Sequence, residues 1–214
     1  MRSMKRAVVV STVLLGASTA MAAPYQASID LSGLGGADLQ LELILYDNSG
    51  VIGDSWILVD NVMLGSALDD FEDGTLGAFN DRLNPGSVSV VPGSFTDTGN
   101  FLMRIDEDPV FFPTIAYRDY SSPDGDVLTF DFELITTGEE GFFGPDEFVV
   151  SLLNPDTLDP LVPGLTGGGD VLAITAQGLV YSDTVAVQVI PAPGALLLGL
   201  IGFGTLRRWR REVG

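Results

Sequence analysis

Apolar and polar side chains alternate along much of the central part of the chain. In segment 127–134 the large apolar side chains stand at every second position, with threonine, aspartate and glutamate between them. Segment 39–45 follows the same period with one lapse, and the apolar positions of 148–152 and 185–189 repeat it. A two-residue period is typical of a β-strand with one face against a core. We therefore predict strands in these four segments.

Six further segments, rich in β-branched and aromatic residues, also predict strands. They are 25–31, 56–64, 87–91, 101–105, 110–117 and 171–175. Clusters of Gly, Pro, Asp and Asn separate the strands and favour turns, and no stretch of ten or more residues has helical spacing. About ten short strands in one domain indicate an all-β fold, an antiparallel β-sandwich of the jelly-roll type.

The first 22 residues have the pattern of a secretory signal peptide. The basic residues near the start are Arg2, Lys5 and Arg6. The mostly apolar stretch 7–16 is too short to span about 30 Å of hydrocarbon. Small residues at Ala20 and Ala22 suit a signal peptidase, so cleavage is predicted before Ala23. We expect export, and an uncleaved N-terminal anchor is the alternative.

The last 24 residues combine three features. Pro191, Ala192 and Pro193 come first, and thirteen uncharged residues follow at 194–206. Thirteen helical residues extend only about 20 Å, which is short for a membrane span. The basic cluster at the end consists of Arg207, Arg208, Arg210 and Arg211, with Trp209 among them. The arginines favour the cytoplasmic side of a membrane, and the tryptophan favours its interface.

This three-part pattern resembles the PEP-CTERM sorting signal. The resemblance implies that the tail first holds an exported protein in the inner membrane of a Gram-negative bacterium. It also implies a partner, the transpeptidase-like membrane enzyme exosortase, which processes the tail at a Pro-Glu-Pro motif. Here Ala192 stands in place of the glutamate, a difference that bears on processing more than on the tail's membrane character. A C-terminal anchor that is never cut is the alternative.

The chain therefore divides into a signal peptide (1–22), an ectodomain (23–190) and a sorting or anchor segment (191–214). Three arginines and 28 carboxylates lie in the ectodomain, giving it a formal charge of about −25, against −19 for the whole chain. Such a surface attracts cations and repels polyanions, which argues against nucleic acid as a partner. The absence of cysteine and histidine excludes disulfides, Cys/His zinc sites and imidazole-dependent catalysis.

Two resemblances concern the ectodomain. The turn at 30–33 and the segments 39–45, 55–64, 148–153 and 155–157 together resemble a group of PEP-CTERM proteins of unassigned function, which implies a shared fold and no activity. Segment 56–64, followed by 70–74, resembles the sequence that flanks the first and last strands of sugar-binding jelly-roll modules.

Four carboxylates within five residues form a candidate calcium site. Calcium accepts 6–8 oxygen ligands in irregular geometry, and these residues could supply several: Asp69, Asp70, Glu72 and Asp73. The spacing is not that of an EF-hand, and a solvated acidic turn is the alternative. Weaker groups are Asp106, Glu107 and Asp108, and Asp119, Asp124 and Asp126. Among 28 acids, some pair will always have the separation used in glycoside hydrolysis, so such a pair is no evidence of a hydrolase. We expect no enzyme activity.

Aromatic residues form a second candidate site. Tyr117 and Tyr120 flank Arg118 and Asp119, a combination that could stack on a sugar and hydrogen-bond to it. Ordinary packing is the alternative, and for Trp56 in its apolar strand it is the expected one. The pairs at 111–112 and 142–143 are each split by the strand alternation, so one ring of each is expected to face outward or into a loop.

We expect a non-enzymatic, exported β-sandwich that is anchored at first in the inner membrane. From there it reaches the cell surface or extracellular matrix, and the PEP-CTERM resemblance supplies the link to extracellular polysaccharide. The alternative function is a calcium-dependent carbohydrate-binding module.

Overall fold

The structure is a computed structural model that describes residues 24–48, 55–82, 86–95, 99–106, 113–136, 145–165, 169–175 and 177–190. The predicted signal peptide and the tail 191–214 lie outside these residues, as do Glu107, Asp108 and the phenylalanine pairs at 111–112 and 142–143. Within the described ranges, the chain contains no helix with the length and apolar character needed to cross a membrane.

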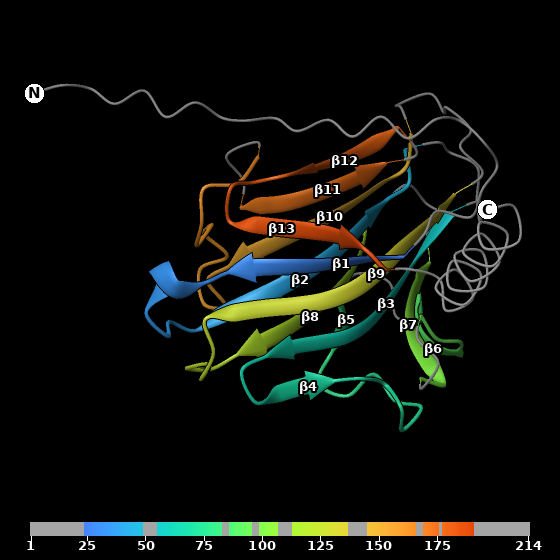
Figure 1. The fold of residues 1–214 in the computed structure, drawn as a ribbon, viewed down its shortest axis with the longest axis horizontal. Helices are drawn as coiled ribbons and strands as arrows, with labels where there is room; N and C mark the ends of the chain where they lie inside the picture. Colours follow the sequence, from blue (N-terminus) through green and yellow to red (C-terminus); the bar gives the residue numbers. More distant parts are fainter. Residues whose placement is uncertain are drawn as a thin grey trace, which may run out of the picture.

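Two antiparallel sheets make up the described part of the chain (Figure 1). Sheet A has seven strands, in the order β13 (Val185–Val189), β1 (Tyr25–Asp30), β9 (Val127–Thr136), β3 (Ser55–Leu64), β7 (Phe101–Asp106) and β6 (Val88–Pro92), with β4 (Ala67–Asp69) also paired with β3. Sheet B has six, in the order β12 (Gly178–Tyr181), β11 (Asp170–Thr175), β10 (Glu147–Leu153), β2 (Leu39–Tyr46), β8 (Thr114–Tyr120) and β5 (Asn80–Arg82). A short 3-10 turn, η1 (Ser32–Leu34), follows β1.

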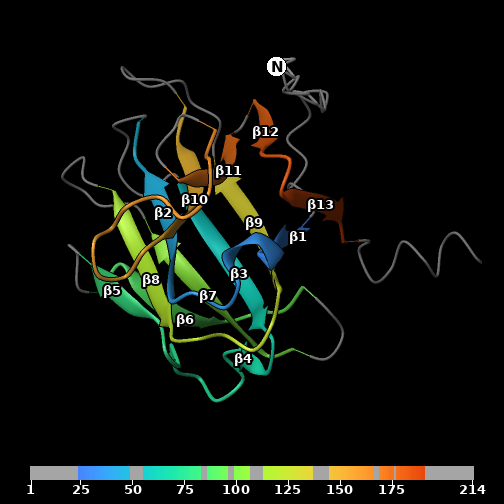
Figure 2. The same ribbon diagram turned by 90° about the vertical axis from the view of Figure 1, so that its left-hand side faces the viewer.

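The two sheets pack face to face around one apolar core (Figure 2). Alternating side chains of the central strands point into it, and the largest fully buried ones include Phe130 and Phe132 on β9 and Phe148 on β10. The rings of Phe132 and Phe148 lie 5.8 Å apart and so join sheet A to sheet B. The period of two in the sequence therefore separates the inner face of each sheet from its outer face.

The prediction of an all-β fold with antiparallel sheets is confirmed. Each of the ten predicted segments contains a strand, although residues 110–112 lie outside the described part and β8 runs on to Tyr120. Three short strands were not predicted, namely β4, β5 and β12. They have three or four residues each, too few for a two-residue period to stand out.

A β-bulge interrupts β3 beside β9. Residues up to Asp60 pair with β9 in one register, and from Met63 onward the register is shifted by one residue. Asn61 lies at the shift with φ of 51°, in the left-handed region that asparagine tolerates better than most residues. Because of the extra residue, Ile57 and Val59 before the bulge and Val62 after it all reach the core.

The first and last strands lie side by side at one edge of sheet A. β1 pairs with β13 along its whole length, and the backbone N–H of Ile190 donates to the carbonyl of Pro24 at 2.7 Å. The two ends of the described chain therefore leave the sandwich next to each other.

Candidate functional site

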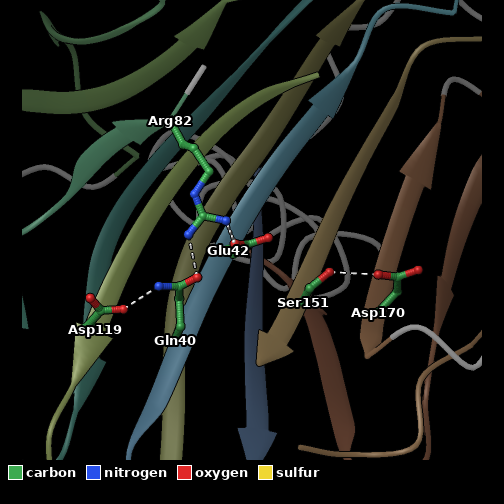
Figure 3. Close-up of polar contacts among 6 residues, drawn as sticks. All are labelled: Gln40, Glu42, Arg82, Asp119, Ser151 and Asp170. Atoms are coloured by element: carbon green, nitrogen blue, oxygen red, sulfur yellow. Dashed lines mark hydrogen bonds and ion pairs between the residues drawn. The ribbon is translucent and has the colours of Figure 1, made fainter. Parts of the chain in front are cut away.

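The outer face of sheet B carries a network of polar side chains, which we call the Arg82 network (Figure 3). It consists of Arg82 on β5, Gln40 and Glu42 on β2, and Asp119 on β8. The Arg82 guanidinium donates to Glu42 Oε1, and to Gln40 Oε1 at 2.7 Å. Gln40 Nε2 donates in turn to Asp119 Oδ1 at 2.5 Å. The even-numbered positions of β2 face away from the core, which is why these groups meet there.

Burial and the charge of Arg82 act in opposite directions on the pKa of Glu42. Only 6% of its side chain is exposed, and burial raises its pKa, with the negative charge of Asp119 adding to the rise. The guanidinium of Arg82 opposes both effects. Arg82 also lies over the ring of Tyr117, 4.5 Å from its centroid, as in a cation–π contact. With 30% of its side chain exposed, Arg82 is more accessible to solvent than its partner Glu42.

An apolar cluster lies beside this network on the same face. It consists of Ile44, Ile115 and Val149, with Tyr117 and Ala173 packed against it. Beyond it, the hydroxyl of Ser151 on β10 donates to Asp170 on β11 at 2.7 Å (Figure 3). The outer face of sheet B thus combines hydrogen-bonding groups with an aromatic ring and an apolar centre. The apolar residues Ile44, Ile115 and Val149 are themselves buried, whereas Arg82, Tyr117 and Asp119 are accessible to solvent.

The two tyrosines predicted as a sugar platform do not lie together. Tyr117 faces outward into the apolar cluster, whereas Tyr120 is three positions further along β8 and belongs to the core. Burial raises the pKa of Tyr120 to about 12, although the nearby Arg118 opposes the rise. The Arg118 guanidinium lies 4.5 Å from the centroid of the Tyr120 ring. An odd spacing along a strand places two side chains on opposite faces, and here it separates the pair.

Trp56 was expected in the core, and that expectation is wrong. Its neighbour Ile57 faces the core, and Trp56 itself is half-buried on the outer face of sheet A. Arg104 on β7 lies over its indole, 4.6 Å from the ring centroid, and also pairs with Asp106. The contact on sheet A is of the same kind as that between Arg82 and Tyr117 on sheet B.

The four carboxylates of the predicted calcium site point to different partners. Asp69 pairs with Arg118. Glu72 accepts both the backbone N–H and the side-chain amide of Asn100, at 2.7 and 2.9 Å. Asp73 accepts the backbone N–H and the hydroxyl of Thr75, at 2.8 and 2.7 Å. The remaining residue, Asp70, accepts the backbone N–H of Glu72 at 3.2 Å.

The structure therefore does not bring these four groups into one ligand set. Across the ranges that the structure describes, no three carboxylates are gathered in a way that could hold a metal ion. The weaker acidic groups are also dispersed, since Asp106 pairs with Arg104 and Asp124 accepts from the backbone and hydroxyl of Ser66. In this turn the four side chains are directed to separate partners, while a calcium ion needs several oxygens that converge on one point.

A pair of carboxylates that was not predicted from the sequence lies on sheet A. Asp60 on β3 stands directly opposite Asp131 on β9, and their exposed fractions are 2% and 4%. Asn61 in the bulge donates its backbone N–H to Asp60 at 2.8 Å and its side-chain amide to Asp131 at 3.0 Å. Gln26 on β1 donates to the other oxygen of Asp131 at 2.9 Å.

The environment of Asp60 favours its protonated form. Burial raises its pKa to about 7, and the negative charges of Asp131, Glu72 and Asp70 add to the rise. The hydrogen bond from the backbone of Asn61 opposes it. In the sequence, the only sign of this pair is an aspartate that interrupts the apolar run 56–64.

No protein-family model, curated protein or solved structure matches the chain. Its own surface residues are therefore the basis for inferring a function. The Arg82 network is partly open to solvent, whereas the Asp60–Asp131 pair is closed to it. A ligand reaches the first of these sites more easily than the second.

Proposed function

We propose that the protein is an exported, non-enzymatic β-sandwich of the cell envelope or extracellular matrix, sorted through its PEP-CTERM-like tail. The tail's three-part pattern and the basic start of the chain support the two address segments. The link to extracellular polysaccharide follows from the same resemblance.

One structural observation supports this arrangement more than any other. The backbone of Ile190 is hydrogen-bonded to Pro24 at 2.7 Å, and Pro191, the first residue of the tail, follows at once. The folded edge and the tail are therefore contiguous, with no spacer between them. We expect the protein to be attached to the membrane through the segment that follows the β1–β13 edge in the sequence.

We also propose that the sandwich is a jelly roll. Consecutive strands change sheet at β1, β2 and β3 and again at β8, β9 and β10. In addition, β2 pairs with β8 while β3 pairs with β9. Such pairing is expected when a long antiparallel hairpin wraps around a core, which is the connectivity of a jelly roll.

Replacing the tail arginines tests the sorting function. Serine at positions 207, 208, 210 and 211 is expected to abolish retention of the C-terminus on the cytoplasmic side and to mislocalise the protein. The matched control is Glu212→Gln, which changes a tail charge outside the basic cluster. Fractionation of cells and the mass of the mature protein are the measurements. If neither changes in the serine variant, the proposal is wrong.

A second change addresses processing itself. Ala192→Glu restores the motif that the tail resembles and is expected to speed cleavage. Mass spectrometry of the mature protein from its native host fixes both termini at once. An unchanged rate would show that the middle residue of the motif is dispensable.

Carbohydrate binding is a second candidate function, and the Arg82 network favours it. The side chains of the network offer hydrogen bonds beside the ring of Tyr117, on the outer face of sheet B. In affinity gels containing the host's extracellular polysaccharide, Arg82→Ala is expected to weaken retardation. Arg104→Ala, which removes the similar contact on sheet A, is the matched control. Running the gels with calcium and with a chelator tests the calcium-dependent form of this function. Equal migration of both variants and the parent protein would argue against sheet B as the binding face.

A further inference from the structure

β13 is an edge strand of sheet A. In the described part of the chain, β13 is the outermost strand of sheet A and pairs on one side only, with β1 (Figure 1). The N–H of Ile190 donates to Pro24 and the N–H of Asp30 donates to Thr184, so the even-numbered residues of β13 bond to β1. The N–H and C=O groups of Val187 and Val189 therefore point to the open edge.

This edge lies in a part of the ectodomain that has few charges. Among residues 171–190, Asp183 is the sole charged side chain, although the ectodomain has a formal charge of about −25. Val189 is 54% exposed, and Val180 on β12, the edge strand of sheet B, is 40% exposed. Natural proteins protect edge strands with charges or proline, and β13 has neither within its five residues. Repulsion between two copies of a polyanionic chain is weakest where the local charge is low.

We propose that β13 pairs antiparallel with β13 of a second copy, which joins two A sheets into one. In a register centred on Val187, this residue lies opposite its counterpart, Val185 lies opposite Val189, and Ala186 lies opposite Gln188. The valines of both copies then face the same side and extend the apolar layer. The two Asp183 carboxylates are eight residues apart in this register, about 27 Å, and beyond the screening length at physiological salt. A parallel pair would bring them together, so the antiparallel arrangement is the favoured one.

The absence of cysteine makes a direct test possible. A single cysteine at Val187 can form a disulfide only with another chain, and an antiparallel hydrogen-bonded pair places its Cα atoms about 5.5 Å apart, within disulfide range. We expect full-length Val187→Cys, purified in mild detergent, to form a covalent dimer under mild oxidation. Val127→Cys, at an exposed valine of the central strand β9, is the matched control and is expected to stay monomeric.

Two further measurements separate edge pairing from association through the apolar tail or the detergent. Adding Val189→Lys to the Val187→Cys chain is expected to abolish the cross-link, whereas adding Val127→Lys is expected to leave it. In the unmodified protein, the amides of Val187 and Val189 are expected to gain protection from hydrogen exchange as concentration rises. Cross-linking of Val187→Cys no faster than of Val127→Cys overturns the proposal. So does a cross-link that survives Val189→Lys, or unprotected amides in a dimer.

Discussion

Arg118 on β8 and Asp69 on β4 form an ion pair that joins sheet B to sheet A. Only 11% of the arginine side chain and 9% of the aspartate side chain are exposed. The guanidinium also lies over the ring of Tyr120 in the core. A carboxylate that the sequence associates with an acidic turn is therefore neutralised by a cation from the opposite sheet.

Removing one partner of this ion pair should lower the free energy of unfolding. Arg118→Ala leaves Asp69 buried without its counter-charge, and we expect the free energy of unfolding to fall by about 3–5 kcal/mol. The matched control is Arg104→Ala, because the Arg104–Asp106 pair has exposed fractions of 34% and 36%. An exposed pair of this kind contributes about 0–1 kcal/mol. Urea unfolding measures both variants, and equal losses would contradict a special role for the inter-sheet pair.

Asp60 should make the protein less stable as the pH rises. Its pKa is about 7 in the folded state, against 3.8 in an unfolded chain. Between these values the folded protein keeps a proton that the unfolded chain releases, so stability falls with increasing pH by up to about 1.4 kcal/mol per unit. We expect Asp60→Asn to remove this decline and to be more stable than the parent protein above pH 7.

Urea unfolding at several pH values between 4 and 8 tests the role of Asp60. The informative quantity is the difference in stability between the parent protein and Asp60→Asn, because it cancels the contributions of the other carboxylates. Asp30→Asn is the control, since Asp30 is exposed and accepts the backbone N–H of Ser32, which lowers its pKa. A difference that stays constant across this range would show that Asp60 titrates normally.

Calcium and sodium should stabilise the protein equally at matched ionic strength. The carboxylates at 69–73 are engaged with separate partners, and a calcium site there would require Asp69 to leave Arg118. Screening of a charge of about −25 by either salt should still raise the melting temperature. Thermal melting in the two chlorides is the measurement. A larger rise in calcium, reduced by Asp70→Asn with Asp73→Asn, would instead establish the predicted site.

Gly125 should tolerate no side chain. A Cβ atom there would lie 2.5 Å from the backbone of Gly65, which joins β3 to β4. We expect Gly125→Ala to destabilise the protein by about 1–3 kcal/mol, because the backbone of a neighbouring turn must move. Gly33→Ala is the control, since a Cβ atom at that position meets nothing within 4 Å. Chemical denaturation compares the two, and equal stabilities would show that the turns can separate at little cost.

The period of two predicts most strands because it reports a local property, the alternation of inner and outer faces. It does not predict the bulge at Asn61, since the bulge depends on the register between β3 and β9, which lie far apart in sequence. Segment 56–64 is correctly predicted as one strand. Trp56 was expected in the core because its strand is apolar, whereas the alternation with Ile57 places it on the outer face.

The candidate sites show the same division between local and distant information. Four neighbouring acids suggest a common ligand, yet hydrogen bonds in their own turn direct Asp70 and Asp73 to backbone groups. The partners of Asp69 and Glu72 come from distant segments, Arg118 and Asn100. The Arg82 network likewise joins three strands, so no residue spacing in the sequence predicts it.

The pairing of the first strand with the last bears on when the chain can fold. Ala27 lies beside Phe130 on one side and beside Val187 on the other, so β1 has no neighbour in its sheet until more than half of the protein has been made. A chain that emerges N-terminus first, from a ribosome or a translocation channel, must keep its opening strand unpaired for most of that time. Long-range pairing of this kind makes folding slow. The sheet is completed only when β13 appears, a few residues before the tail.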